Sequence, residues 1–207
     1  MKKELILVGG GGHCKACIDV IEAQGEYSIA GIVDLNGKIG ELVLNYKIIA
    51  CDEDLPKLAK EYKYFLISIG QIKALQKRAQ KFKILKGCGA EFPVIISPLS
   101  YVSKHASIDE GTIVMHRVAV NAAAKVGKNC ILNTGAVIEH DVVIKDNCHI
   151  ATCAVVNGGT VVGENCFIGS NSAVREGIQV GSGSVIGAGV TILSSLPEKS
   201  FVKKDSD

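Results

Sequence analysis

The chain has 207 residues, which is enough for one large domain or two small ones. Hydrophobic residues make up 47% and charged residues 21%, proportions that exclude an intrinsically disordered chain. The formal net charge of +2 gives no reason to expect nucleic acid or a membrane surface as a partner. The first apolar run, residues 5–8, is too short for a signal peptide core or a membrane-spanning helix, so we expect a cytoplasmic protein.

The N-terminal half alternates predicted strands and helices. Strands are expected at residues 5–8, 28–33, 47–50 and 65–69, and helices at residues 13–24, 54–62 and 71–86. Short apolar runs that end in glycine or aspartate indicate strands buried on both faces of a parallel sheet. The pattern therefore predicts a small Rossmann-like α/β domain over residues 1–97.

The C-terminal half has an aliphatic residue at every sixth position, without a break. These residues are Val102, Ile108, Val114, Val120, Val126, Leu132, Ile138, Ile144, Ile150, Val156, Val162, Ile168, Val174, Val180, Ile186 and Ile192. The position four residues later is mostly small: Thr112, Ala124, Cys130, Ala136, Cys148, Ala154, Thr160, Cys166, Ser172 and Ser184. This is a hexapeptide repeat, and it predicts a left-handed parallel β-helix over residues 98–207, with three repeats, about 18 residues, in each triangular coil.

The sequence has eight cysteines, and without a secretion signal we expect them to be reduced thiols. Cys130, Cys148 and Cys166 are spaced by one coil, which predicts one interior column of small apolar side chains. Cys14 and Cys17 form a C-x-x-C, which fits a redox motif or half of a zinc site. No second C-x-x-C follows, so we expect Cys14 in a glycine-rich turn and Cys17 on a buried helix face.

His140 is the histidine whose neighbours favour catalysis. It follows Ile138 by two residues, where the chain is expected to turn outward, and Glu139 and Asp141 flank it. A neighbouring carboxylate can fix the tautomer of an imidazole and raise its basicity. We therefore predict that His140 accepts a proton from an amine or hydroxyl as that group attacks a thioester; the alternative is a structural or merely exposed histidine.

The glycine loop at residues 9–12 follows a predicted strand and opens a predicted helix. Glycines let the backbone approach a phosphate, and a helix N-terminus offers free N–H donors. Cys14 stands where a dinucleotide fingerprint has its third glycine, so a nucleotide-sugar or pyrophosphate site fits better than NAD. Asp34, at the end of the second strand, suits a hydrogen bond to a ribose or a base. A tight turn without a ligand is the other interpretation.

Residues 131–141, Ile-Leu-Asn-Thr-Gly-Ala-Val-Ile-Glu-His-Asp, are the most specific element of a wider pattern. Together with a Rossmann-like domain placed before the β-helix, they resemble the sugar acetyltransferases typified by the PglD and NeuD proteins of bacterial glycan and sialic acid biosynthesis. The resemblance runs from the glycine loop to about Leu193. It implies a homotrimer that uses acetyl-CoA as co-substrate, without a metal, to N-acetylate a nucleotide-linked amino sugar of the UDP-4-amino type. O-acetylation of sialic acid or a related sugar remains open.

The resemblance also implies roles for single residues. His140 matches the catalytic base, Asp141 the acidic residue that supports it, and Asn133 an active-site asparagine. The coenzyme A site is matched by His149, Gly158, Ser170 and Ala188. The nucleotide-sugar pocket is matched by Gly11, Gly12, His13, Asp34 and Gly70.

The sequence departs from the family pattern at three places. Ser97 precedes Pro98 where the family usually has histidine, and Cys14 replaces a small residue of the glycine loop. The last twelve residues, 196–207, lack the usual glycine-x-proline-alanine-lysine tail, which leaves coenzyme A binding at the last coil undecided.

Two other functions fit the repeat. The γ-class carbonic anhydrases are similar in the repeat only, and they need three converging histidines, two of them close in sequence. Gly135 and Ile144 stand five residues before His140 and His149, so such a pair is absent from the sequence. A non-catalytic trimer that binds sugar nucleotides is the second alternative; the presence of His140 and the glycine loop argues against it.

Overall fold

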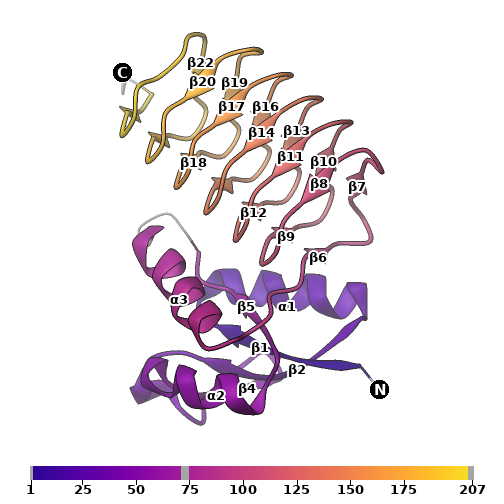
Figure 1. Cartoon of the computed structure of the whole chain (residues 1–207), viewed down its shortest axis with the longest axis vertical. Coiled ribbons are helices and arrows are strands. Elements are labelled where there is room, and N and C mark those ends of the chain that lie inside the picture. Colours follow the sequence, from indigo (N-terminus) through magenta and orange to yellow (C-terminus); the bar gives the residue numbers. More distant parts are fainter. Residues whose placement is uncertain (1, 71–74, 205–207) are drawn as a thin grey trace. The chain divides into compact units, whose positions relative to one another are not determined.

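The computed structural model describes residues 2–70 and 75–204, and it divides the chain into two compact units, Met1–Ile95 and Ile96–Asp207 (Figure 1). Each unit has a different architecture. The first is an α/β sandwich around one sheet, and the second is a stack of short parallel strands. Both architectures agree with the fold predicted from the sequence.

The sheet of the first unit has the strand order β3-β4-β2-β1-β5. Its strands are β1 (Lys3–Val8), β2 (Tyr27–Val33), β3 (Leu42–Val43), β4 (Tyr46–Ala50) and β5 (Tyr64–Ile67). Four of them pair in parallel, as predicted, but β3 pairs antiparallel with β4 and forms an edge hairpin that the prediction missed. A two-residue strand is too short to show a period in the sequence.

The helices of the first unit are α1 (Gly12–Gln24), α2 (Leu55–Glu61) and α3 (Leu75–Gly87), with short 3₁₀ segments η1 (Asn36–Lys38) and η2 (Asp52–Asp54). Helix α1 ends at Gln24, and Gly25 caps it with a left-handed φ of 74° that suits glycine. The start of the helix predicted at residues 71–86 lies outside the described residues. Among the described helices, none has the length and apolar character needed to cross a membrane.

Cys14 does not lie in the glycine turn where it was expected. Helix α1 already begins at Gly12, so Cys14 belongs to its first turn and is fully buried. Cys17 is buried on the same helix, as predicted. Burial raises the pKa of the Cys14 thiol to about 11 and raises that of Cys17 further, so neither forms the reactive thiolate readily.

The second unit is a three-sided prism of two-residue strands. One side holds β7 (Tyr101–Val102), β10 (Ala119–Val120), β13 (Val137–Ile138), β16 (Val155–Val156), β19 (Ala173–Val174) and β22 (Thr191–Ile192). The next holds β8 (Ser107–Ile108), β11 (Lys125–Val126), β14 (Val143–Ile144), β17 (Val161–Val162) and β20 (Gln179–Val180). The third holds β6 (Ile95–Ile96), β9 (Ile113–Val114), β12 (Ile131–Leu132), β15 (His149–Ile150), β18 (Phe167–Ile168), β21 (Val185–Ile186) and β23 (Phe201–Val202).

The aliphatic period sets the register of the prism. Each strand pairs in parallel with the strand 18 residues later, so that Val120, Ile138 and Val156 stack in one interior column. The second residue of every strand from β7 to β22 is one of the predicted aliphatic positions. These side chains are buried except in the first coil, where Val102 and Ile108 are only partly covered. The predicted hexapeptide β-helix is confirmed.

Left-handed backbone conformations close the corners. One corner repeats Asn129, Asn147 and Asn165 with φ angles of 53°, 57° and 58°. Asparagine tolerates this region better than most residues, and the Asn129 side-chain amide donates to Asn147 Oδ1 at 2.8 Å. The asparagines therefore adopt the left-handed conformation at this corner that glycines such as Gly135 and Gly159 adopt at other corners.

The cysteine column lies inside the prism, as predicted, and it is polar as well as apolar. Cys130, Cys148 and Cys166 are fully buried, and each thiol points to a backbone carbonyl of the following coil. Cys148 Sγ lies 3.0 Å from the oxygen of Gly163. Thr112 makes the equivalent bond from its hydroxyl to Gly127 O at 2.7 Å. A small side chain with a weak donor is thus the common feature of this column.

We expect Cys148→Ser to cost less than about 1 kcal/mol of unfolding free energy, because its hydroxyl can replace the thiol as donor. Cys148→Leu should cost about 1–3 kcal/mol or more, because the side chain is fully buried and in contact with the coils on both sides, so a larger one would overpack the interior. Urea denaturation of both variants measures the difference. Equal stability of the two would contradict a tightly packed interior column.

Candidate active site

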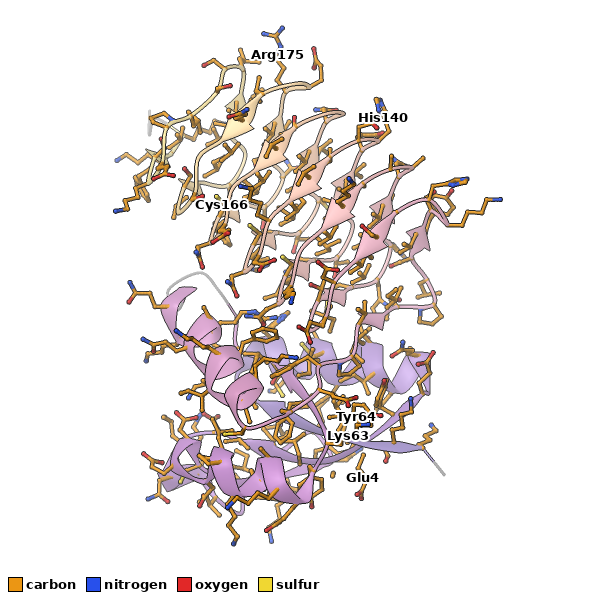
Figure 2. All side chains as sticks on the ribbon, viewed as in Figure 1. Glu4, Lys63, Tyr64, His140, Cys166 and Arg175 are labelled. Carbon is orange, nitrogen blue, oxygen red and sulfur yellow. The ribbon has the colours of Figure 1, made fainter. Side chains whose placement is uncertain are left out.

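His140 stands at the corner between β13 and β14, and Figure 2 shows its side chain pointing away from the coils. The imidazole is 66% exposed, and its Nδ1 lies 2.8 Å from Oδ2 of Asp141. Asp141 itself has a φ of 60°, which turns its carboxylate back alongside the preceding side chain. The pair is therefore set by the geometry of the corner and not by burial.

This contact selects one form of the ring. A carboxylate accepts a hydrogen bond from Nδ1–H, which leaves the proton off Nε2 in the neutral imidazole. The lone pair of Nε2 is then free to take a proton from a nucleophile. An exposed imidazole with one nitrogen held by a carboxylate has the features that the sequence suggested for a base.

Gly158 is the glycine on which this histidine depends. It lies one coil after His140, and a Cβ placed on it would come within 2.6 Å of Cε1 and 2.7 Å of Nε2 of the ring. Any other residue would push the imidazole aside. The neighbouring N–H of Gly159 donates to the carbonyl of His140 at 3.0 Å and holds the two coils together. The side of the ring that carries Nε2 therefore lies against bare backbone.

Asn133 and His149 form a separate contact on the same prism. Asn133 Nδ2 lies 3.2 Å from His149 Nε2, and the His149 ring meets Phe167 edge-on with centroids 5.2 Å apart. His149 is only 4% exposed. Asn133 precedes β13 whereas His140 follows it, so the two sit at opposite ends of that strand. Within one chain, the predicted asparagine contacts His149 and not the predicted base.

Ser170 and Ala188 lie on the same corner as Asn133. They fall in the turns before β19 and β22, two and three coils beyond the turn that contains Asn133. The N–H of Gly189 donates to Ser170 O at 2.8 Å, one of the bonds that stack these turns. The predicted coenzyme A residues thus follow two corners, Gly158 on one and Ser170 with Ala188 on the other.

The first unit contains a cavity of about 670 Å³ at the carboxyl ends of β1, β2 and β5. Ligands bind at this edge in open α/β sheets. All five residues predicted for a nucleotide-sugar pocket line this cavity: Gly11, Gly12, His13, Asp34 and Gly70. The fold brings these residues together from three separate connections.

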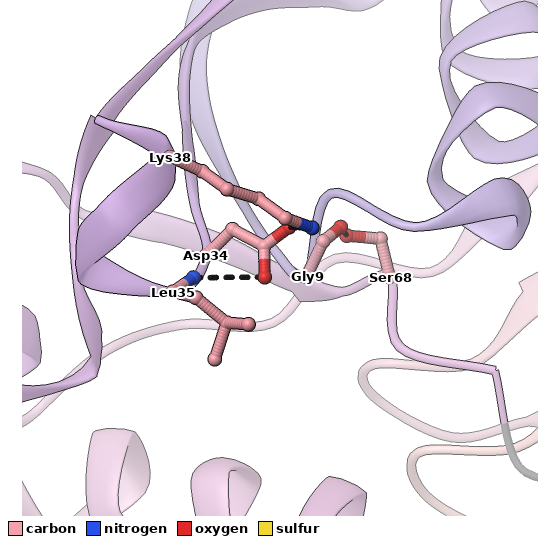
Figure 3. Close-up of polar contacts among 5 residues, drawn as sticks. All are labelled: Gly9, Asp34, Leu35, Lys38 and Ser68. Atoms are coloured by element: carbon pink, nitrogen blue, oxygen red, sulfur yellow. Dashed lines mark hydrogen bonds and ion pairs between the residues drawn. The ribbon is translucent and has the colours of Figure 1, made fainter. Parts of the chain in front are cut away.

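Glycines shape the floor of the cavity. A Cβ on Gly9 would lie 2.4 Å from Cγ1 of Ile69, and the φ of Gly9 is 109°, so no side chain fits there. The hydroxyl of Ser68 donates to Gly9 O at 2.7 Å and joins the loop to the end of β5 (Figure 3). Gly11 and Gly12 have open space over them at the start of α1. Their backbone is accessible to a ligand.

Asp34 lies at the end of β2, beside the glycine loop (Figure 3). Its Oδ1 accepts the N–H of Leu35 at 2.8 Å, and its Oδ2 lies 3.1 Å from Nζ of Lys38. Its side chain is 15% exposed, so it still reaches the cavity. These bonds hold the carboxylate in one orientation.

His13 is neutral at physiological pH. Burial, followed by the nearby charge of Arg78, lowers its pKa to about 4. The Arg78 side chain is fully buried and donates to the carbonyls of Ile67 and Ile69 at the end of β5. The buried Arg78 guanidinium therefore places a positive charge close to His13 in the cavity wall.

Five further residues that were not predicted for the site also line the cavity: Lys38, Asp52, Ser68, Lys77 and Lys81. Ser68 was missed because the strand predicted at residues 65–69 included it, whereas β5 ends at Ile67 and leaves Ser68 in the connection that follows. The lysines of α3 could not be found from the sequence, since a helix rich in lysine looks like an ordinary solvated face. Among the described residues, no three histidine, cysteine or acidic side chains are grouped as a metal site.

Comparison with known proteins matches both units. Residues 4–82 match the PglD N-terminal domain model, residues 123–158 the bacterial transferase hexapeptide model (six repeats), and residues 159–194 the hexapeptide repeat of succinyl-transferase.

Solved structures agree over nearly the whole chain. A mutant of perosamine N-acetyltransferase from Caulobacter crescentus, in complex with CoA and GDP-perosamine, is 31% identical with a TM-score of 0.90, covering 96% of this chain and 92% of that one. The acetyltransferase domain of PglB from Neisseria gonorrhoeae, in complex with acetyl coenzyme A, is 29% identical with a TM-score of 0.88, covering 97% and 96%. WeeI from Acinetobacter baumannii, at 18% identity and a TM-score of 0.84, shares the fold.

The match to perosamine N-acetyltransferase includes both units in one chain, at 31% identity over 96% of this chain and 92% of that one. The chain belongs to the PglD-type family of hexapeptide-repeat sugar acetyltransferases.

Proposed function

We propose that this protein transfers the acetyl group of acetyl-CoA to the amine of a nucleotide-linked amino sugar. The observation that carries the proposal is the exposed His140 imidazole, held by Asp141 and resting on the bare backbone of Gly158. The neighbours bound to CoA with GDP-perosamine and to acetyl coenzyme A support both substrates. The cavity of the first unit gives the nucleotide end of the acceptor a place to bind.

The reaction needs a base, an oxyanion site and a leaving group. His140 Nε2 takes the proton as the amine nitrogen attacks the thioester carbonyl, and Asp141 stabilises the imidazolium that forms. The backbone N–H of Gly158, beside the ring, is our candidate donor to the tetrahedral oxyanion. When the intermediate collapses, the C–S bond breaks and the thiolate of CoA takes a proton from the imidazolium.

A homotrimer would complete the site. The two sets of predicted residues follow separate corners of one prism, and a neighbouring prism could bring the Asn133 corner of one chain to the His140 corner of another. The side between these corners carries small, partly covered apolar residues, Ala119, Val137, Val155 and Ala173, that suit such packing. We place the acetyl-CoA groove at this boundary.

We also propose a cytoplasmic location. All eight cysteines are free thiols, including the exposed Cys88 and Cys153, which suits a reducing compartment. Fractionation of cells that produce the protein would test this directly.

His140→Ala should leave a folded protein with at least a hundredfold less turnover, about the contribution of one general base. Release of the CoA thiol with amino-sugar and hydroxyl-sugar nucleotides measures it and identifies the acceptor group. His105→Ala, which removes another exposed histidine of the same unit, is the control and should keep full activity. A fully active His140→Ala protein would overturn the assignment.

Gly158→Ala should reduce turnover at least tenfold while the fold is kept, since the added methyl displaces an exposed ring and no core residue. In a His140→Ala background the same change should have little further effect. Comparing the two effects tests whether Gly158 acts through the imidazole. Equal losses in both backgrounds would mean that it acts elsewhere.

Subunit mixing tests the shared groove. If Asn133 and His140 act from different chains, inactive Asn133→Ala and His140→Ala proteins that are unfolded, mixed and refolded together should regain about a quarter of wild-type activity, the share of grooves with both residues intact in random trimers. Each variant refolded alone should stay inactive. No recovery in the mixture would place both residues in one chain's site.

A further inference from the structure

Besides the glycine loop, the lining of the first unit's cavity includes several charged side chains. Three lysines, Lys38, Lys77 and Lys81, face two aspartates, Asp34 and Asp52. Lys38 is paired with Asp34 at 3.1 Å and Lys81 with Asp52 at 2.5 Å. Lys77 has no carboxylate partner among the described residues, so the lining carries a net positive charge.

Two of these lysines come from one face of α3. Lys77 and Lys81 are four residues apart, one helical turn, and therefore lie on the same side of the helix. The residue between them in the same turn, Arg78, anchors the helix, because its buried guanidinium donates to the carbonyls of Ile67 and Ile69. Those carbonyls flank Ser68 in the cavity wall. The anchor thus fixes both lysines beside the cavity.

The glycine loop offers a different kind of anion site in the same cavity. The backbone at Gly11 and Gly12 opens α1, where N–H groups and the helix dipole favour a phosphate. Such a site satisfies one phosphate group well. A nucleoside diphosphate carries a second charged phosphate, which needs its own donors when it leaves water.

We propose that Lys77 and Lys81 are specificity-determining residues that hold the diphosphate of the acceptor, and so select nucleoside-diphosphate sugars over monophosphate-linked or free sugars. This rests on the proposed acetyl transfer and assigns the acceptor class to particular side chains. Lys77 contacts the phosphate outright. Lys81 shares its charge between the phosphate and Asp52, which holds its ammonium near the cavity.

The test is binding of GDP and UDP, their monophosphates and their nucleosides to the full-length protein by calorimetry. Lys77→Gln and Lys81→Gln should each weaken the better diphosphate about tenfold, the value of one charged hydrogen bond, and leave the nucleoside unchanged. Lys83→Gln, an exposed lysine of the same helix outside the cavity, is the matched control. Equal weakening of nucleoside and diphosphate would show a structural effect and overturn the proposal.

Asp52→Asn provides a test of opposite sign. Removing this carboxylate releases Lys81 and takes a negative charge from the cavity, so diphosphate affinity should rise severalfold. Raising the salt concentration should reduce the gain. A fall in diphosphate affinity would mean that Asp52 supports the site in another way and would count against the proposal.

Kinetics separate this proposal from the proposed function. With an accepted nucleotide amino sugar, the Lys77 and Lys81 variants should raise KM for the acceptor about tenfold while kcat stays near wild type. His140→Ala, by contrast, should lower kcat. Unchanged KM in the lysine variants, beside an inactive His140 variant, would overturn the lysine assignment and leave acetyl transfer standing. A fully active His140→Ala protein would instead overturn the proposed function.

Discussion

Stacking of one coil on the next is the constraint on which the C-terminal unit depends. A strand of two residues makes few hydrogen bonds, so no strand here holds its place without the strands 18 residues before and after it. The interior aliphatic columns fix that spacing, and the small residues at the pinched positions allow it. Every corner residue, including His140, therefore inherits its position from the core. The His140 side chain is exposed, yet its backbone is hydrogen-bonded to the next coil through Gly159, and that of the adjacent Asp141 to the previous coil through Ala122.

The two candidate sites differ in their electrostatics. At the prism corner, one carboxylate holds an exposed imidazole, and water can reach both. In the α/β cavity, burial and a neighbouring guanidinium keep His13 neutral, while lysines supply the charge for an anion. The first arrangement suits proton transfer and the second suits tight binding of a charged nucleotide. In the proposed reaction, the cavity residues would bind the nucleotide of the acceptor, and His140 would carry out the proton transfer.

The fold of the prism could be predicted from the sequence because its six-residue period is unbroken. Such a period allows only one register, in which each strand pairs with the strand 18 residues later. The sequence also pointed to the residues around the cavity, since Gly11, Asp34 and Gly70 each follow a strand of a parallel sheet. Other features follow from contacts distant in sequence. That Gly158 lies under the His140 ring depends on coil stacking, and that Lys77 and Lys81 face the cavity depends on how Arg78 anchors α3. The β3 hairpin was too short to detect, and Cys14, which was expected in a glycine-rich turn, lies in the first turn of α1 because that helix already begins at Gly12.

The position of His140 in the stack determines how much of the prism follows it along the same corner. Three more coils follow it on the same side of the prism, at β16, β19 and β22, and neighbouring strands are about 4.8 Å apart. The corner beyond His140 is therefore about 14 Å long, with one step of about 4.8 Å for each coil. Adding or removing a whole coil past Gly158 would lengthen or shorten this corner without moving the imidazole. Duplication of one coil could therefore lengthen the surface available to an extended ligand while His140 and its neighbours keep their positions.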